Sequence, residues 1–201
     1  MHTKIIHRQL DIGDFSAVDA FWTQLASEGI SVDVFVSNAA AFPELKPLLE
    51  IGTKVTWSQL NTNVHAPMYL LEKFHAQNTG KQRLHATCHY EACSIRFRKI
   101  VRDYALPDGC EGYTVDEMQI ASMHPGLLWQ EEWVKMGFKD DIDLITSFFR
   151  VISQFGSTPN AAFLHGRFAW ASWDVNELSE GPLRKRIDED PYYLKMTVRG
   201  A

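Results

Sequence analysis

Cysteine, positive charge and long apolar runs are all scarce in this chain of 201 residues. Its three cysteines, Cys88, Cys93 and Cys110, are few and cannot all pair within one chain, which disfavours a disulfide framework. We therefore expect a reducing, cytoplasmic setting. The formal net charge of -5 disfavours nonspecific binding of nucleic acid, which depends on positive charge. No segment reaches the roughly 18 unbroken apolar residues of a membrane span, and no signal-peptide run opens the chain. We therefore expect neither nucleic acid nor a membrane as a partner.

What remains is the composition of an ordinary globular domain. Hydrophobic residues make up 45% of the chain and charged residues 22%, which is enough apolar material for a core. The length corresponds to about one domain, and no repeat, low-complexity tract or linker divides it. The sequence therefore predicts a single domain over residues 1–201.

Hydrophobic periodicity predicts helices that alternate with short strands. The predicted helices cover Phe15–Leu25, Thr56–Gln77 and Asp141–Phe155, with the basic stretch Ser94–Tyr104 as a further candidate. The predicted strands cover Lys4–Leu10, Val32–Val36, Leu84–Cys88, Glu117–Met123 and Phe168–Asp174, the last with a turn as its alternative. This alternation indicates βαβ units and a parallel sheet. Ligands of such sheets bind at the carboxyl ends of the strands, so the loops that follow the strands are the candidate sites.

Residue types at the predicted helix ends support these boundaries. The segment Asp11-Ile12-Gly13-Asp14 is typical of a turn that leads into a helix cap, and Gly29 is a natural stop for that helix. Thr56 followed by Gln59 has the form of a capping box, which predicts the start of the long helix. Asn78-Thr79-Gly80 predicts its end.

Four short segments, in order along the chain, resemble motifs of the short-chain dehydrogenase/reductase family. Asp11-Ile12-Gly13-Asp14 resembles the Asp-Val-Thr-Asp segment after the family's third strand, and Ser37-Asn38-Ala39-Ala40 resembles the Asn-Asn-Ala-Gly segment after its fourth. Asn61-Thr62-Asn63-Val64 resembles the Asn-Val segment of the fifth helix. His124-Pro125-Gly126-Leu127-Leu128 resembles the Pro-Gly segment after the sixth strand. The tail from Gly166 to Val175 is similar to fungal members, many of which act in secondary metabolism.

This resemblance implies an α/β fold, a partial Rossmann-like doubly wound parallel sheet that begins near the family's third strand. It implies an oxidoreductase that uses NADP or NAD and acts on a small alcohol or carbonyl compound. A small-molecule substrate is then the expected partner, and homo-oligomer formation is compatible with the family. Because the resemblance starts at the third strand, we expect the first two βα units of the family to be absent.

The resemblance also implies roles for individual residues. Asp11 would meet the adenine, and Asn38 would lie near the ribose. Pro125, Gly126 and Leu128 would contact the cofactor, with Leu128 lining the nicotinamide pocket. These five residues are the predicted cofactor-binding set.

Asn63 is the one predicted catalytic residue, because the family uses this Asn to hold a water in a proton relay. The alternative from residue chemistry alone is structural, since an Asn within a helix can simply bond the backbone. No metal site is expected. His85, Cys88, His89 and Cys93 lie close together but do not have the spacing of a zinc site.

Two features that the family requires do not occur in the sequence. There is no Gly-x-x-x-Gly-x-Gly turn, whose backbone N–H groups would hold the pyrophosphate. Between about Leu84 and Glu117 no Tyr is followed by Lys at the fourth position, although that Lys would lower the pKa of the Tyr for proton transfer. One Tyr-x-x-x-Lys, Tyr69 to Lys73, lies in the long helix. We therefore expect an impaired or inactive enzyme.

Three alternatives remain open at this point. The chain could be a non-catalytic interaction protein that pairs with a partner through an exposed edge of its sheet. It could lack a stable fold, because a shortened parallel sheet uncovers apolar surface. Residues 81–112 could also be a replaced or misread segment, since their composition is unusual for the family.

Overall fold

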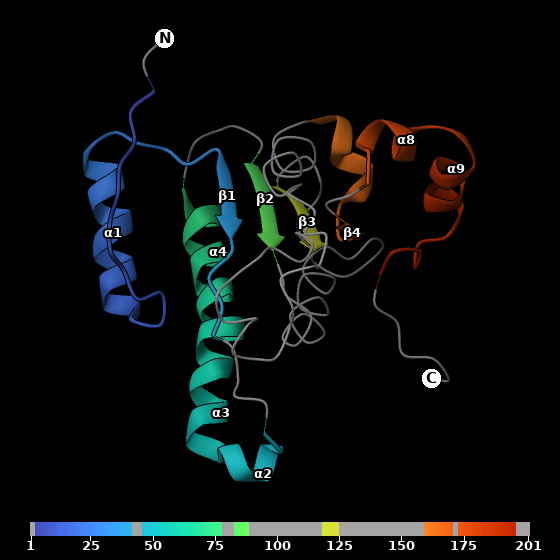
Figure 1. Cartoon of the computed structure of the whole chain (residues 1–201). Helices are drawn as coiled ribbons and strands as arrows, with labels where there is room; N and C mark the ends of the chain where they lie inside the picture. The colour runs from blue at the N-terminus through green and yellow to red at the C-terminus, as the bar shows by residue number, and fades with distance from the viewer. Residues whose placement is uncertain are drawn as a thin grey trace, which may run out of the picture. The chain divides into compact units, whose positions relative to one another are not determined.

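The computed structural model describes residues 3–41, 46–77, 83–88, 118–124, 159–170 and 173–195 (Figure 1). Contacts divide the chain into two compact units. The helical unit comprises Met1–Val32 and Ala39–Thr79, and the sheet unit comprises Asp33–Asn38 and Gly80–Ala201. The single domain over residues 1–201 stays a prediction.

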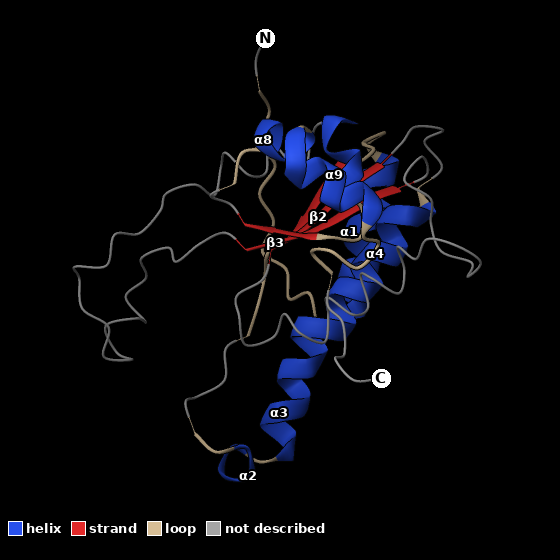
Figure 2. Cartoon of the chain, turned by 90° about the vertical axis from the view of Figure 1, so that its right-hand side faces the viewer, coloured by secondary structure: helices blue, strands red, loops and turns tan. Residues whose placement is uncertain are grey.

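The sheet unit contains parallel strands in the order β1-β2-β3-β4, drawn in red in Figure 2. Their bounds are β1 (Val34–Ser37), β2 (Arg83–Cys88), β3 (Met118–His124) and β4 (Phe168–Trp170). One row of register partners crosses all of them: Ser37, Thr87, Ser122 and Phe168. The predicted parallel sheet is therefore confirmed, with strand ends that differ by a few residues from those expected.

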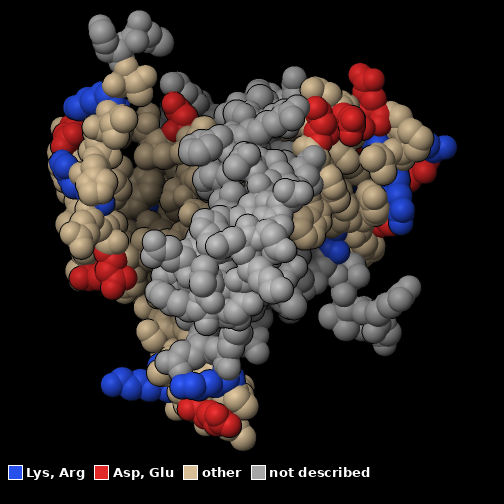
Figure 3. Space-filling view, viewed as in Figure 1, with Lys and Arg blue, Asp and Glu red and all other residues tan. Residues whose placement is uncertain are grey.

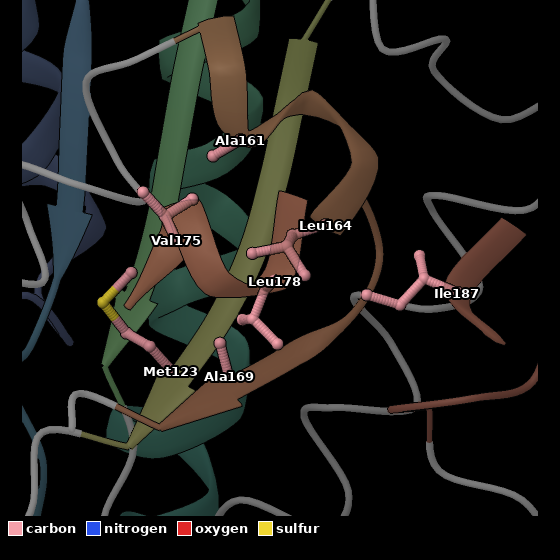
Figure 4. Close-up of a cluster of buried hydrophobic side chains, with 7 residues drawn as sticks. All are labelled: Met123, Ala161, Leu164, Ala169, Val175, Leu178 and Ile187. Atoms are coloured by element: carbon pink, nitrogen blue, oxygen red, sulfur yellow. The ribbon is translucent and has the colours of Figure 1, made fainter. Parts of the chain in front are cut away.

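A compact apolar cluster packs the sheet unit. Its helical parts are η2 (Pro159–Leu164), α8 (Val175–Ser179) and α9 (Gly181–Glu189). The buried members, shown in Figure 4, are Met123, Ala161, Leu164, Ala169, Val175, Leu178 and Ile187. The cluster thus joins β3 and β4 to all three helical parts. Removal of this much apolar surface from water is the main source of stability for such a layer.

A buried arginine fixes the chain that follows α9. The Arg167 side chain is 8% exposed. Its Nη2 donates to Ile187 O at 2.8 Å, and its Nη1 donates to Asp190 O at 3.3 Å and also to Tyr193 O. Burial lowers the pKa of Arg167 below its ordinary value, because a charged group loses hydration there. The carbonyl groups replace that hydration, so one side chain ties the C-terminal segment to the sheet unit.

The outer surface of α9 is charged. Arg184 pairs with Asp188 at 2.9 Å and Lys185 with Glu189 at 3.7 Å, each one helical turn apart. Acidic and basic side chains accordingly lie together over α8 and α9 in the space-filling view (Figure 3). Such exposed pairs contribute little to stability, so the opposite face, with Ile187, provides the packing.

The helical unit begins with α1 (Phe15–Ser27), whose two ends follow the predicted signals. Asp14 is the N-cap and accepts a hydrogen bond from Ala17 N at 3.1 Å. Gly29 follows the helix with φ 68°, a conformation that glycine adopts without strain. Val18 and Leu25 are the buried side chains of α1. The predicted helix and its stop are confirmed.

The predicted long helix is also confirmed, but it has three parts: α3 (Thr53–Leu60), the π-helical turn η1 (Asn61–His65) and α4 (Ala66–Ala76). A short helix, α2 (Leu48–Ile51), precedes them. Pro67 has no N–H, so the hydrogen-bonding pattern of a regular α-helix cannot run through this point. The Ala66 N–H reaches back to Asn61 O instead, which is the spacing of a π-helix.

The capping box at Thr56 and Gln59 was a wrong prediction. The helix starts three residues earlier, after Gly52, whose φ of 78° turns the chain at the N-cap position. Thr56 lies inside the helix, where its Oγ1 donates to Gly52 O at 3.0 Å. A glycine able to take a positive φ sets the boundary here, so no side-chain cap is needed.

The strand predicted at Lys4–Leu10 was also wrong. These residues have no regular secondary structure, and Ile5 is 87% exposed. An extended segment becomes a strand only when a neighbour takes its backbone hydrogen bonds, and no described strand pairs with this one. The predicted helices Ser94–Tyr104 and Asp141–Phe155 lie outside the described residues.

Candidate functional site

The carboxyl end of the sheet carries one predicted residue within the described ranges. Asn38 directly follows β1 and is exposed, while Ser37 before it is buried. In a parallel sheet all carboxyl ends lie at the same edge, where ligands of this class of fold bind. Asn38 is therefore placed where a ligand could reach it. Its contact with a ribose stays a prediction.

Asn63 lies in η1 and is 5% exposed. Its side chain pairs with both backbone groups of Ala41: Ala41 N donates to Asn63 Oδ1 at 2.7 Å, and Asn63 Nδ2 donates to Ala41 O at 2.7 Å. This two-way clasp fixes the loop Ala39–Ala41 on the long helix. The structural alternative for Asn63 is thus present in the structure. The relay role stays a prediction, and it would have to coexist with the clasp.

Asp11 forms a tight turn in front of α1. Its Oδ1 accepts from Gly13 N at 2.9 Å, and its main-chain oxygen accepts from Asp14 N at 3.1 Å. Aspartate commonly stabilises a turn in this way. The side chain is exposed, so the carboxylate is both fixed in place and accessible to a ligand.

Another residue of η1 touches this turn. A Cβ at Gly13 would lie 3.0 Å from Asn61 Nδ2, which leaves no room for a larger residue without movement. Asn61 Oδ1 in turn lies 3.2 Å from His65 Nδ1. Sequence reasoning did not single out Asn61. Gly13 and Asn61 are far apart in the sequence, so their close approach leaves no signal in residue spacing.

The Tyr69-x-x-x-Lys73 pair joins α4 to α1 through Asp19. Tyr69 Oη donates to Asp19 Oδ1 at 2.7 Å, Lys73 Nζ lies 2.5 Å from the same oxygen, and Nζ is 4.9 Å from the centre of the Tyr69 ring. The Lys73 hydrogen bond, followed by that of Tyr69, lowers the pKa of Asp19. The hydrogen bond to Asp19 likewise raises the pKa of Lys73. The Tyr–Lys pair therefore serves as a link between two helices.

The remaining predicted positions are those of the Pro-Gly segment and the histidine–cysteine stretch. Pro125, Gly126 and Leu128 lie outside the described residues, as do His89 and Cys93 of the histidine–cysteine stretch. Within the described part of the chain no group of three or more His, Cys, Asp or Glu could hold a metal ion. Among the same described residues, no helix has the length and apolar character to cross a membrane.

The chain is similar to curated proteins of one kind. It is 26% identical over 206 residues to the short chain dehydrogenase/reductase AacuD of Aspergillus aculeatus, an alignment that covers 95% of this chain and 68% of the relative. It is 34% identical over 93 residues to the short chain dehydrogenase/reductase nsrO of Aspergillus novofumigatus, covering 44% of this chain and 28% of that one. No protein-family profile matches the chain.

Solved structures show the same architecture. A 4-hydroxyisoleucine dehydrogenase complexed with NADH aligns with a TM-score of 0.61 at 18% identity, over 81% of this chain and 77% of that one. A short chain dehydrogenase/reductase family protein aligns with a TM-score of 0.57 at 17% identity, over 81% and 73%. At these identities the shared property is the fold, and the partial Rossmann-like α/β prediction is confirmed.

Proposed function

Because the chain belongs to the short-chain dehydrogenase/reductase family, we propose that it is an oxidoreductase of that type, built to bind a nicotinamide cofactor and a small alcohol or carbonyl compound. One observation carries the proposal: a parallel sheet in the order β1-β2-β3-β4, with Asn38 exposed at its carboxyl end. Sheets of this kind bind their ligands at that edge. The relatives with dehydrogenase/reductase names support the same activity.

We propose that Asp11 binds the adenine and Asn38 the ribose, and that Pro125, Gly126 and Leu128 contact the nicotinamide side. The fixed, exposed carboxylate of Asp11 supports the first assignment. The preference between NAD and NADP depends on the contacts of the adenosine ribose, where an acidic residue favours NAD and an arginine favours NADP.

Turnover by this chain is proposed to be low. The segment between Leu84 and Glu117 has no Tyr-x-x-x-Lys, and the one such pair, Tyr69 and Lys73, is already engaged with Asp19. A Tyr that donates to a carboxylate is not poised to pass a proton to a carbonyl. Asn63, if it holds a relay water, would then lack the Tyr and Lys to which the relay leads.

The test is a fluorescence titration of the folded chain with NADH and NADPH, followed by an assay with small ketones and aldehydes. We expect binding in roughly the high-micromolar to millimolar range, since the pyrophosphate loop is the main anion-binding element of such folds. Replacing Asn38 with Leu should weaken binding further, whereas Asn176→Ala, an exposed position on α8, should not. Micromolar binding together with carbonyl turnover would overturn the proposed impairment. No binding of either cofactor at several millimolar would overturn the proposed site.

A second function is favoured by the position of β1. Among the described strands β1 ends the sheet and pairs with β2 alone. The backbone groups on the outer side of such a strand can pair with a strand of another chain. We propose non-catalytic association through this edge as the alternative function.

A further inference from the structure

An exposed tryptophan ends β4 at the carboxyl edge of the sheet. Trp170 is the last residue of that strand and is 37% exposed, whereas Ala169 before it is 1% exposed. The other large hydrophobic side chains that are exposed in the described part of the chain lie outside the strands. Ligands of such sheets bind at this edge, so the indole of Trp170 is apolar surface within reach of a ligand.

The indole lies on the face of the sheet opposite the apolar cluster. Successive side chains of a strand point to opposite faces. Ala169 packs in the cluster together with Met123 (Figure 4), so Phe168 and Trp170 lie on the other face. The packing of η2, α8 and α9 against the sheet therefore does not account for Trp170.

Several contacts fix the end of β4. The rings of Phe168 and Trp170 meet edge to face, with centroids 5.7 Å apart and an interplanar angle of 83°. The main-chain oxygen of Trp170 accepts a hydrogen bond from Trp173 N at 3.0 Å. Phe168 N donates to Leu194 O at 2.8 Å, which ties the strand to the C-terminal segment. A ring that is already held in place loses little conformational freedom when a ligand packs on it.

The sheet register puts Trp170 beside the end of β3. Its register partner is His124, the last residue of that strand, and neighbouring strands lie about 4.8 Å apart. Pro125 and Gly126 follow His124 in the sequence, and in the proposed function they contact the nicotinamide side of the cofactor. A substrate has to lie against the nicotinamide to exchange a hydride with it. The part of the substrate on the β4 side would then meet the indole.

We propose that Trp170 is a specificity-determining residue that packs against a flat aromatic ring of the substrate. The inference rests on the proposed function and names its substrate class: alcohols or carbonyl compounds whose reacting group is attached to an aromatic ring. Two aromatic rings attract each other beyond the area that they bury, because their electron distributions are complementary in stacked and edge-to-face arrangements. A saturated ring of the same size lacks this attraction. Trp170 therefore distinguishes the two kinds of substrate.

The experiment compares acetophenone with cyclohexyl methyl ketone, which has the same carbon skeleton but a saturated ring. Both are titrated into the whole chain by ligand-observed NMR, together with the oxidised cofactor, with which a ketone does not react. Wild type should bind acetophenone about fivefold more tightly, the preference expected from one aromatic contact. Trp170→Leu should bring the two affinities to within about twofold, because leucine offers apolar surface but no ring. Trp57→Leu makes the same change at a tryptophan that is 73% exposed on α3, and should keep the wild-type ratio.

A second readout uses the wild-type chain and does not depend on how Trp170→Leu folds. The indole N–H signal of Trp170, assigned by its absence from the spectrum of Trp170→Phe, should shift with acetophenone and less with cyclohexyl methyl ketone. The inference alone is overturned if the cofactor binds but wild type does not distinguish the ketones, if folded Trp170→Leu keeps the wild-type ratio, or if Trp57→Leu loses it equally. If neither the cofactor nor either ketone binds, the proposed function is overturned and the inference with it.

Discussion

Asp19 on α1 forms an ion pair with Lys73 on α4 and so links the two helices. Its side chain is 48% exposed and that of Lys73 is 32% exposed. Lys73, and then Tyr69, lower the pKa of Asp19 from 3.8, so the ionised carboxylate stabilises the fold above that pH. This contribution is lost as pH falls through the lowered pKa of the folded state. For Lys73 the pKa is raised from 10.5, and its contribution is lost as pH rises through the raised value.

The loss of the Asp19 contribution at low pH can be tested. As the pH falls from about 6 to about 3, the urea concentration at the midpoint of unfolding should decrease more for wild type than for Asp19→Asn. The reason is that Asp19→Asn has no carboxylate that titrates at this position. The difference should be small, because exposed pairs are screened by water. Glu72→Gln removes an exposed carboxylate from α4 without touching Asp19 and should behave as wild type. If the plots of unfolding midpoint against pH were parallel for wild type and Asp19→Asn, the contact of Asp19 with Lys73 and Tyr69 would contribute nothing to stability.

At the scale of elements, the C-terminal segment depends on Arg167. Arg167→Met would keep the apolar stem but leave the carbonyl groups of Ile187, Asp190 and Tyr193 without their donor. We expect a loss of about 2 kcal/mol in unfolding free energy, the usual cost of unsatisfied buried groups. Trypsin should then cleave α9 faster, at sites such as Arg184. Glu189→Gln, which removes an exposed carboxylate from α9 but no trypsin site, should leave both readouts unchanged. Equal cleavage of Arg167→Met and wild type would contradict the anchoring role.

The elements that sequence predicted well are those set by local signals. Asp14 and Gly29 bound α1 by their own chemistry, and the helix was expected almost as it is. The strand at Lys4–Leu10 failed because a strand depends on a distant partner. A backbone-bonding role for Asn63 was among the alternatives from sequence, but its partner was not predicted, because the backbone of Ala41 carries no residue signature. The resemblance nevertheless indicated Asn63 and Asp11 as residues of interest.

At the scale of the whole molecule, the second proposed function has a direct readout. Association through β1 predicts a mass by light scattering that rises with concentration towards twice that of one chain. Val34→Lys places a charge on the edge strand, a common means of preventing edge-to-edge pairing, and should return the chain to a monomer. Leu49→Lys, at a 95% exposed position on α2, is the matched control. A monomer at all concentrations, with a cooperative thermal melt, would exclude the association and leave the oxidoreductase proposal standing.

The register of the sheet has a consequence for how the chain reaches this structure. Val34 pairs with Leu84, Arg83 with Met118, and Ser122 with Phe168, so every pair of neighbouring strands closes a loop of tens of residues. During synthesis β1 emerges long before β2 exists to receive it. Sheets with such distant pairing fold slowly and expose apolar edges while they wait. The yield of native protein from a cell should therefore depend on chaperone supply and temperature more strongly than the number of residues suggests.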